Sequence, residues 1–209
     1  MKQQRKMIAR TDEEKALKRD QILDAAYEML SRRGYHEATM GKIARKAGVS
    51  HGTLYWHFKS KEDLFFAVLE REFLRVDEAI RPALAMDQPA IKKIEMLLRF
   101  SVSTLEQSSD FLALMFSAMA GSSERFERSL EEMAKTVYST YNDMLEQIII
   151  MGKKEGDIRE DVNARAVAVA MVSLLDALYL QYGLGTATMD HEKLADGLWD
   201  FIENGLVKK

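Results

Sequence analysis

Apolar side chains recur three or four positions apart along most of this 209-residue chain, and that period is typical of α-helices. Only two prolines and 11 glycines interrupt the pattern. No segment keeps the strict alternation of apolar and polar residues that a half-buried strand shows. The sequence therefore predicts an all-α protein of about nine helices.

The first expected helix runs from about residue 12 to residue 33, with Ile22, Ala26, Met29 and Leu30 on one face and Gly34 as its stop. Thr39 and Ser50 are plausible N-caps of two short helices that end near residues 47 and 58. Ser60 precedes a long helix that ends near Pro82, with Asp63 where a capping-box partner would lie. Further helices are expected at about 89–107, 110–120, 123–154, 163–184 and 191–205.

Charge is divided unevenly along the chain. Residues 1–61 hold 14 Lys/Arg against 7 Asp/Glu, and the remainder holds 16 against 26, which gives the net charge of -3. A basic first third indicates a polyanionic partner, with nucleic acid ahead of anionic lipid, although a basic tail that only aids solubility gives the same count. We expect a flexible basic arm over 1–11, a DNA-binding domain over 12–60 whose linking helix reaches about 76, and a second domain over 61–209.

The basic residues of the arm have two interpretations. They could enter a minor groove or attract phosphates without specificity, and they could equally be part of a disordered terminus. The residues concerned are Lys2, Arg5, Lys6 and Arg10.

Several protein classes are disfavoured by what the sequence lacks. The start has no apolar signal segment, and the most apolar run, 166–175, is too short to cross a bilayer, so we expect a cytoplasmic protein without a membrane partner. The chain has no cysteine and only four histidines, and it has no Gly-rich phosphate loop or metal-ligand spacing. We therefore expect no catalytic site, no metal and no cofactor.

The segment 39–58 has the spacing of a helix-turn-helix. Ala44 is small where the two helices would cross, Gly48 lies at the turn, and Val49 and Leu54 would fill the space between the helices. The second helix would then place its first turn in a major groove, because that turn reaches deepest. The residues that it offers to base edges are His51, Gly52 and Thr53.

A second group of side chains lies along the flank where phosphates would run. Tyr55 and His57 can donate hydrogen bonds to phosphate oxygens, and Lys61 adds charge at the start of the next helix. Phe58 is expected in the core. Trp56 suits either helix packing or DNA contact.

This segment resembles the N-terminal domain of TetR-family transcriptional regulators. The family motif reads Ile-Ala-x-x-Ala-Gly-Val-Ser and then Gly-Thr-Leu-Tyr-x-His/Tyr-Phe, and here it reads IARKAGVS (43–50) and GTLYWHF (52–58), followed by KSKEDL (59–64). The resemblance covers residues 16–76. It implies phosphate contacts from Thr39, Tyr55, His57 and Lys61, and base contacts from Lys42, Ser50, His51 and Thr53.

The second domain shows the pattern of a dimer interface. Residues 164–182 are apolar nearly all round, as in a helix packed between its own core and a partner. The last helix places Leu194, Leu198, Phe201 and Ile202 at core spacing, with Trp199 off that face. We expect these two helices to form half of an intersubunit four-helix bundle, as the resemblance also implies; two ordinary core helices of a monomer are the alternative.

Methionine is concentrated in the same domain. Residues 86–171 carry eight of the 13 methionines, together with several aromatic residues. Met fills core gaps and lines adaptable apolar pockets alike, so a filled core remains the alternative to a ligand pocket. The candidate lining residues are Met96, Phe100, Met115, Met119, Tyr138, Tyr141 and Met171, and Asn142 and Asp176 could orient a ligand.

Together with these patterns, the resemblance to the TetR family implies a dimeric, DNA-binding transcriptional repressor that an apolar or amphipathic small molecule releases from a palindromic operator. A regulator without a small-molecule ligand, controlled by a protein partner, is the alternative, and activation instead of repression is also open.

Overall fold

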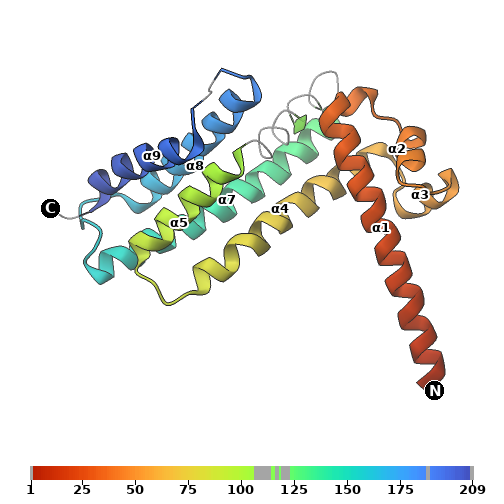
Figure 1. The fold of residues 1–209 in the computed structure, drawn as a ribbon, viewed down its shortest axis with the longest axis horizontal. Helices are drawn as coiled ribbons and strands as arrows, with labels where there is room; N and C mark the ends of the chain where they lie inside the picture. Colours follow the sequence, from red (N-terminus) through yellow and green to blue (C-terminus); the bar gives the residue numbers. More distant parts are fainter. Residues whose placement is uncertain (1, 106–113, 116–117, 119–122, 187–188, 208–209) are drawn as a thin grey trace. The chain divides into compact units, whose positions relative to one another are not determined.

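The computed structural model describes residues 2–105, 114–115, 118, 123–186 and 189–207, with the side chains of residues 2–12 and 83 outside that description. Eight helices make up the described part, as predicted for an all-α chain (Figure 1). The expected helix at 110–120 falls mostly outside the described residues. The chain divides into two compact units, Met1–Leu74 with Leu114–Gly121, and Arg75–Ala113 with Ser122–Lys209.

The first unit contains α1 (Lys2–Glu37), α2 (Met40–Lys46), α3 (His51–His57) and the first part of α4 (Lys61–Ala85). The helix α1 begins at Lys2, whereas the sequence placed its start near residue 12, after a flexible arm. Gly34 interrupts α1 with a positive φ of 74°, which glycine adopts without strain. The core of the unit consists of fully buried side chains from α1 to α4: Ile22, Leu23, Leu30, Ile43, Leu54, Phe58, Leu64, Phe65 and Leu69.

The linking helix α4 begins where its capping residues predict. The Ser60 hydroxyl accepts a hydrogen bond from the Asp63 N–H at 3.0 Å, and the Asp63 carboxylate accepts one from the Lys59 N–H at 2.8 Å. This reciprocal cap resembles a capping box. The helix continues past Pro82 to Ala85, beyond the predicted end. A proline in the last turn removes only one backbone hydrogen bond, so the helix can close around it.

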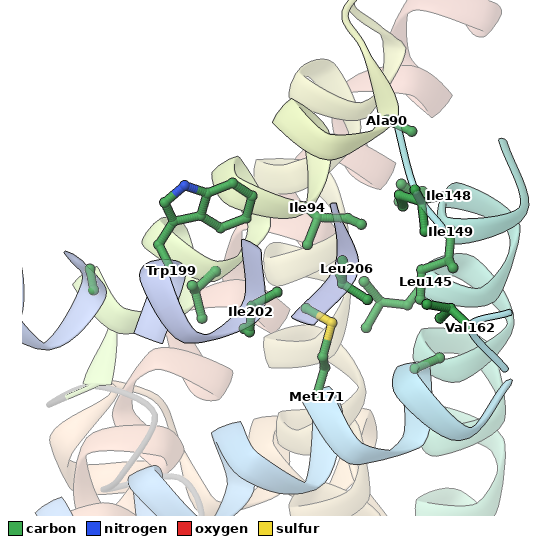
Figure 2. Close-up of a cluster of buried hydrophobic side chains, with 14 of the residues drawn as sticks. Ala90, Ile94, Leu145, Ile148, Ile149, Val162, Met171, Trp199, Ile202 and Leu206 are labelled. Carbon is green, nitrogen blue, oxygen red and sulfur yellow. The ribbon is translucent and has the colours of Figure 1, made fainter. Parts of the chain in front are cut away.

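The second unit packs α5 (Ala90–Ser103), α7 (Glu124–Glu155), α8 (Ala164–Gly183) and α9 (His191–Leu206) around one apolar core. Helix α7 contacts both α8 and α5, and α5 also contacts α9. The side chains that meet between these helices are shown in Figure 2; they include Ala90, Ile94, Leu145, Ile149, Met171, Trp199, Ile202 and Leu206.

The buried face of α9 differs from the predicted one. Trp199 and Ile202 are buried, while the Phe201 side chain is 74% exposed and Leu194 and Leu198 are partly buried. The prediction failed because α9 carries apolar residues on two adjacent faces, and sequence spacing does not tell which one faces the monomer core. An exposed phenylalanine beside a buried tryptophan leaves part of α9 free to meet another surface.

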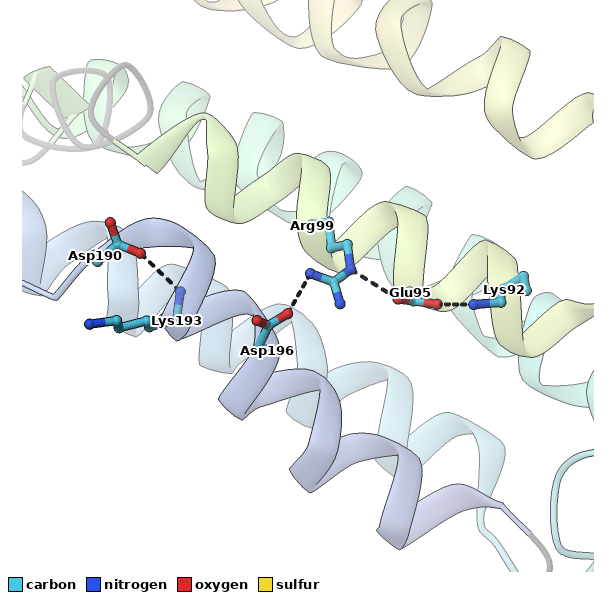
Figure 3. A network of polar contacts seen from close by, with 6 residues as sticks. All are labelled: Lys92, Glu95, Arg99, Asp190, Lys193 and Asp196. Atoms are coloured by element: carbon cyan, nitrogen blue, oxygen red, sulfur yellow. Dashed lines mark hydrogen bonds and ion pairs between the residues drawn. The ribbon is translucent and has the colours of Figure 1, made fainter.

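Polar side chains connect α5 and α9 on the outside of the second unit (Figure 3). The Arg99 guanidinium donates to Glu95 at 2.9 Å and to Asp196 at 2.8 Å, and Lys92 donates to Glu95 at 2.6 Å. The Arg99–Asp196 pair that joins the two helices is exposed to solvent, so it contributes less than about 1 kcal/mol. The apolar core, rather than this network, holds the two helices together.

A tight contact inside the second unit gives a stability prediction. Gly152 on α7 is buried, and an added Cβ would lie 2.6 Å from the Ile158 Cδ1 and 3.0 Å from the Ala90 Cβ. We expect Gly152→Ala to lower the free energy of unfolding by about 1–3 kcal/mol, because this overpacking exceeds the gain in helix propensity. Urea unfolding followed by circular dichroism measures the change.

A double-mutant cycle identifies the cause of that loss. Ile158→Val removes the Cδ1 atom that the new methyl would meet, so it should recover part of the stability that Gly152→Ala loses. Strictly additive effects of the two substitutions would contradict the overpacking explanation.

Helix α8 is apolar but little buried. It is long and apolar enough to cross a membrane by length and composition, contrary to the sequence estimate, which counted only the ten-residue run inside it. Only 17% of its most apolar window is buried. Exposed residues of α8 and its C-cap residue Leu184 form an unbroken series at alternating spacings of four and three residues: Ala166, Ala170, Ser173, Ala177, Leu180 and Leu184. Such spacing forms a continuous seam along one side of a helix.

Candidate DNA-binding site

The turn between α2 and α3 has the geometry that its sequence predicts. The Thr39 hydroxyl caps α2 by accepting from the Lys42 N–H at 3.3 Å, and the Ser50 hydroxyl caps α3 by accepting from the Thr53 N–H at 3.0 Å. Gly48 adopts a φ of 67° between the two helices, which side-chain-bearing residues rarely adopt. The Val49 N–H closes the turn on the Ala44 carbonyl at 3.0 Å. These contacts fix the direction of α3.

Helix α3 is sharply divided between a buried and an exposed side. Leu54 and the capping residue Phe58 are buried, as predicted for Phe58. The exposed side carries His51, Gly52, Tyr55 and Trp56. Tyr55 is 40% exposed and Trp56 is 58% exposed, so Trp56 lies on the outer surface rather than in the core. The seven-residue helix α3 therefore presents an imidazole, a phenol and an indole to solvent, and these groups can donate hydrogen bonds or stack on bases.

Two ring contacts order this exposed side. The His51 and Tyr55 rings lie edge to face with centroids 4.8 Å apart, and the Trp56 and His57 rings do the same at 4.6 Å. Gly52 follows His51 on the same exposed helix, and a Cβ added there would meet the Ser50 hydroxyl only at 3.8 Å, so its bare backbone is open to a close approach. The face is thus ordered before any partner arrives.

The other predicted contact residues are already held by hydrogen bonds. The Thr53 hydroxyl pairs with the Ser50 hydroxyl at 2.8 Å, and the Lys42 ammonium donates to the Glu37 carbonyl at 3.1 Å. The Lys61 ammonium donates to the His36 carbonyl at 3.3 Å and lies 4.2 Å from the centre of the Tyr35 ring. Burial lowers the pKa of Lys61. Lys61 therefore joins the start of α4 to the end of α1 in addition to its predicted role at a phosphate.

Sequence reasoning missed a row of cations on α1. The Lys15 ammonium lies 5.6 Å from the centre of the Trp56 ring, and the Arg19 guanidinium lies 5.3 Å from that of Phe58. Lys18 acts electrostatically on His57. The signal was present in the spacing, because residues 15, 18 and 19 share one face of a helix. This row extends the positive surface beside α3.

The imidazole of His57 gives a pH prediction. Burial, followed by the positive charges of Arg19 and Lys18, lowers its pKa, so His57 is largely neutral in the free protein at pH 7. A phosphate beside it would favour the imidazolium and raise the pKa. The pKa of His57 should then be higher in the DNA complex than in the free protein. DNA affinity should therefore increase as the pH falls through the interval between these two pKa values. The increase is at most about tenfold for each pKa unit that separates them. Fluorescence anisotropy with labelled DNA between pH 6 and 8 measures this slope.

Histidine variants test the assignment. His57→Gln should flatten the slope, whereas His36→Gln should leave it unchanged, and a slope that survives His57→Gln contradicts the prediction. The lowered pKa of His57 affects folding stability in the opposite direction. Because the pKa in the folded state lies below the unfolded value of about 6.5, His57 destabilises the folded protein as the pH falls through that value.

The predicted ligand residues are more dispersed than expected. Met171 is buried in the core of the second unit, Met96, Phe100 and Tyr141 are partly buried, and Tyr138 is 41% exposed. Met115 belongs to the compact unit that contains α1 to α3, and Met119 lies outside the described residues. The described residues contain no group of three or more His, Asp or Glu side chains placed to hold a metal ion.

The sequence matches two family models across most of its length. Residues 22–68 match the bacterial regulatory proteins of the tetR family, and residues 70–205 match the C-terminal region of YsiA-like proteins. The chain belongs to the TetR family of transcriptional regulators. The YsiA-like match places it in the FadR/YsiA-like part of that family, and membership confirms that the chain is a regulator and not an enzyme.

Relatives cover nearly the whole chain. The transcriptional regulator UidR of Escherichia coli K12 is 31% identical over 85% of this chain and 84% of its own. A transcriptional regulator from Saccharomonospora viridis, solved in complex with choline, has a TM-score of 0.79 at 24% identity and covers 91% of this chain and 98% of its own. FadR from Bacillus subtilis, solved with stearoyl-CoA, has a TM-score of 0.74 at 22% identity, with coverages of 88% and 97%. The two solved structures share the fold of this TetR-family chain.

Proposed function

We propose that this TetR-family protein is a homodimeric repressor that acts in the cytoplasm, binds a palindromic operator through two copies of α3, and leaves it when an amphipathic small molecule binds the second unit. The exposed face of α3 carries the proposal. His51, Tyr55 and Trp56 project from α3, whose first turn the Ser50 hydroxyl caps, and a cation of α1 lies over the Trp56 ring. A single α3 buries little surface on DNA, so tight specific binding needs two copies on half-sites about 34–36 Å apart.

The exposed seam of α8 supports the dimer. It runs from Ala166 to Leu184 with small or apolar side chains at almost every position. A second α8 could approach closely along it, and Phe201 of α9 adds apolar area. Self-association through the same surface on both copies is the commonest symmetry of soluble oligomers. A second copy packed along this seam would also remove the exposed apolar surface of α8 from water. That helix is long and apolar enough, by length and composition, to cross a membrane.

The nature of the effector is supported by relatives and by composition. The Bacillus subtilis FadR was solved with stearoyl-CoA, and the Saccharomonospora viridis regulator was solved with choline. Stearoyl-CoA combines a polar group with a long apolar tail, while choline is a small polar cation. The methionines and aromatic residues of the second unit suit the apolar part of an amphipathic ligand.

Helix α4 provides a route from the second unit to DNA. It is continuous from Lys61 to Ala85, and its residues belong to both units. In the first unit the Arg71 guanidinium donates to the Asp20 carbonyl at 3.3 Å and pairs with the Asp24 carboxylate at 2.9 Å, so α4 and α1 are joined there. A ligand that displaces α4 would change the spacing of the two α3 helices, and DNA and ligand would oppose each other by linkage. Near-complete release needs a roughly 10⁴-fold preference of the ligand for the DNA-free state.

Selection of DNA from a genomic library with the purified protein, followed by footprinting, tests the function. We expect a palindromic site with half-sites one helical turn apart, protected by the wild-type protein and not by Tyr55→Ala. Stearoyl-CoA and choline are then titrated against the complex. Release by stearoyl-CoA supports an amphipathic effector, whereas release by choline alone indicates a small polar cation instead. Retention of DNA at saturating amounts of both favours the regulator without a small-molecule ligand.

A further inference from the structure

Polar side chains collect between α7 and α8 of the second unit, where apolar packing would otherwise continue. Tyr138, Tyr141 and Asn142 fall on one face of α7 because they are three or four residues apart. Asp176 and Tyr179 are one turn apart on α8, the helix that packs against α7. We call these five residues the α7–α8 polar cluster.

Asn142 has an unsatisfied acceptor. Its Oδ1 atom is buried, and within the described part of the chain no donor reaches it. A buried carbonyl oxygen without a donor is unfavourable, and native proteins keep few of them. Its presence is explained if a donor arrives from outside the chain.

Asp176 of α8 and Tyr138, one turn before Asn142 on α7, supply further polar groups to the cluster. Burial, followed by the influence of the nearby Asp176 carboxylate, raises the pKa of Tyr138 to about 12, and Asp176 is itself partly buried on α8. A phenol supplies one proton to a group that can accept several, so the carboxylate retains acceptor capacity. Tyr138 is also 41% exposed, which leaves this end of the cluster accessible from solvent.

The charges around the cluster are dominated by carboxylates. Asp77 of α4 acts electrostatically on Tyr141, and it is itself paired with Arg81 one turn further along α4. Burial, then Asp77 and Tyr179, raise the pKa of Tyr141 to about 12, so this phenol stays neutral at physiological pH. The cluster therefore offers a net negative charge, an unpaired amide oxygen and three aromatic rings, whose faces attract cations.

Apolar side chains adjoin the cluster. Leu145 follows Asn142 by three residues on α7 and lies in the buried core, and Met171 and Leu175 occupy the turns of α8 that precede Tyr179. A ligand whose polar end meets the cluster could thus lay an apolar tail along methionine and leucine side chains.

We propose that Asp176, Asn142 and Tyr138 bind the polar end of the effector, and that this end is a protonated amine attached to an apolar tail. The inference rests on the proposed function and specifies its ligand. An ammonium group pairs with Asp176, donates an N–H to the Asn142 oxygen and lies beside the tyrosine rings. A carboxylate in the same place would be repelled by Asp176 and would leave the Asn142 oxygen without a donor.

Three probes with the same ten-carbon tail separate charge from hydrogen bonding. Decylamine carries a positive charge and N–H donors, decyltrimethylammonium carries the charge alone, and decanoate carries a negative charge and only acceptors. We expect isothermal titration calorimetry at pH 7, below micelle-forming concentrations, to rank them in that order, with decylamine about tenfold or more tighter than decanoate. Decanoate that binds as tightly as decylamine overturns the inference.

Four variants locate the binding. Asp176→Asn and Tyr138→Phe should weaken decylamine, the first by about tenfold or more. Asn142→Leu should weaken decylamine and raise the melting temperature of the ligand-free protein, because it removes the unsatisfied oxygen. Asp143→Asn is the control: it removes an exposed carboxylate of α7 that is paired with Arg165, and decylamine affinity should not change. Unchanged affinity in Asp176→Asn, or an equal loss in Asp143→Asn, overturns the assignment.

Failure of this inference is distinguishable from failure of the proposed function. If stearoyl-CoA releases DNA while decylamine gives no binding heat, the repressor function stands and the amine assignment falls. If the protein binds no DNA in the selection experiment, the repressor function falls, while the calorimetric ranking still decides whether the α7–α8 polar cluster binds an amine.

Discussion

Replacing Ala177 with glutamate is expected to convert the dimer into monomers and to weaken operator binding by about a hundredfold or more. Ala177 lies in the middle of the exposed α8 seam. In a symmetric dimer the substitution places two carboxylates in an apolar contact, where an unpaired charge loses its hydration without compensation. A loss of about 3 kcal/mol corresponds to a hundredfold in the dimerisation constant. Size-exclusion chromatography with light scattering measures the mass, and a gel shift measures DNA binding.

Because Ala177 is exposed in a single copy, the Ala177→Glu substitution should affect the dimer interface and leave the fold of each copy intact. The side chain has no core position within one copy, so circular dichroism of the variant should match that of the wild type. Gln147→Glu is the control, because it adds the same carboxylate to an exposed position of α7 outside the seam. A dimeric Ala177→Glu protein would mean that the α8 seam does not form the interface. A monomeric protein that keeps full operator affinity would show that half-site pairing is unnecessary.

The geometry of the helix-turn-helix was largely predictable because its signals are local. The Thr39 and Ser50 caps, the positive φ of Gly48 and the burial of Leu54 each depend on residues within a few positions, and each lies where the sequence placed it. Hydrogen bonds of this kind form within one turn of chain, so their residue types identify them. The fold class followed from helical periodicity for the same reason.

The features that sequence reasoning missed depend on contacts distant in the chain. Lys61 reaches the His36 carbonyl 25 residues away, and Lys15 lies over Trp56 on another helix. Spacing within α9 also could not decide between the Trp199 face and the Phe201 face, because both are apolar. The choice is made by packing against α5. The unsatisfied oxygen of Asn142 is likewise visible only once the neighbours of α7 are in place.

Leu69→Ala is expected to lower the free energy of unfolding of the DNA-binding unit by about 3–5 kcal/mol. The Leu69 side chain is fully buried on α4, among the core residues of the first unit that include Phe65. Truncation loses the transfer free energy of the removed atoms and leaves a cavity that the neighbouring helices fill only in part. A unit of this size has a total stability on the order of 4–11 kcal/mol, so the loss is a large share of it. Urea unfolding monitored by circular dichroism gives the value.

Leu74→Ala is the matched control for that cavity. It removes the same atoms from the same helix five residues later, where the side chain is 55% exposed, and it should change stability by less than about 0.5 kcal/mol. The two variants should also differ in DNA affinity at 37 °C, because Leu69→Ala alone reduces the population in which α3 is held by Leu54 and Phe58. If both substitutions reduce stability equally, burial of Leu69 in the core does not account for the loss, because alanine favours the helix slightly more than leucine at either position.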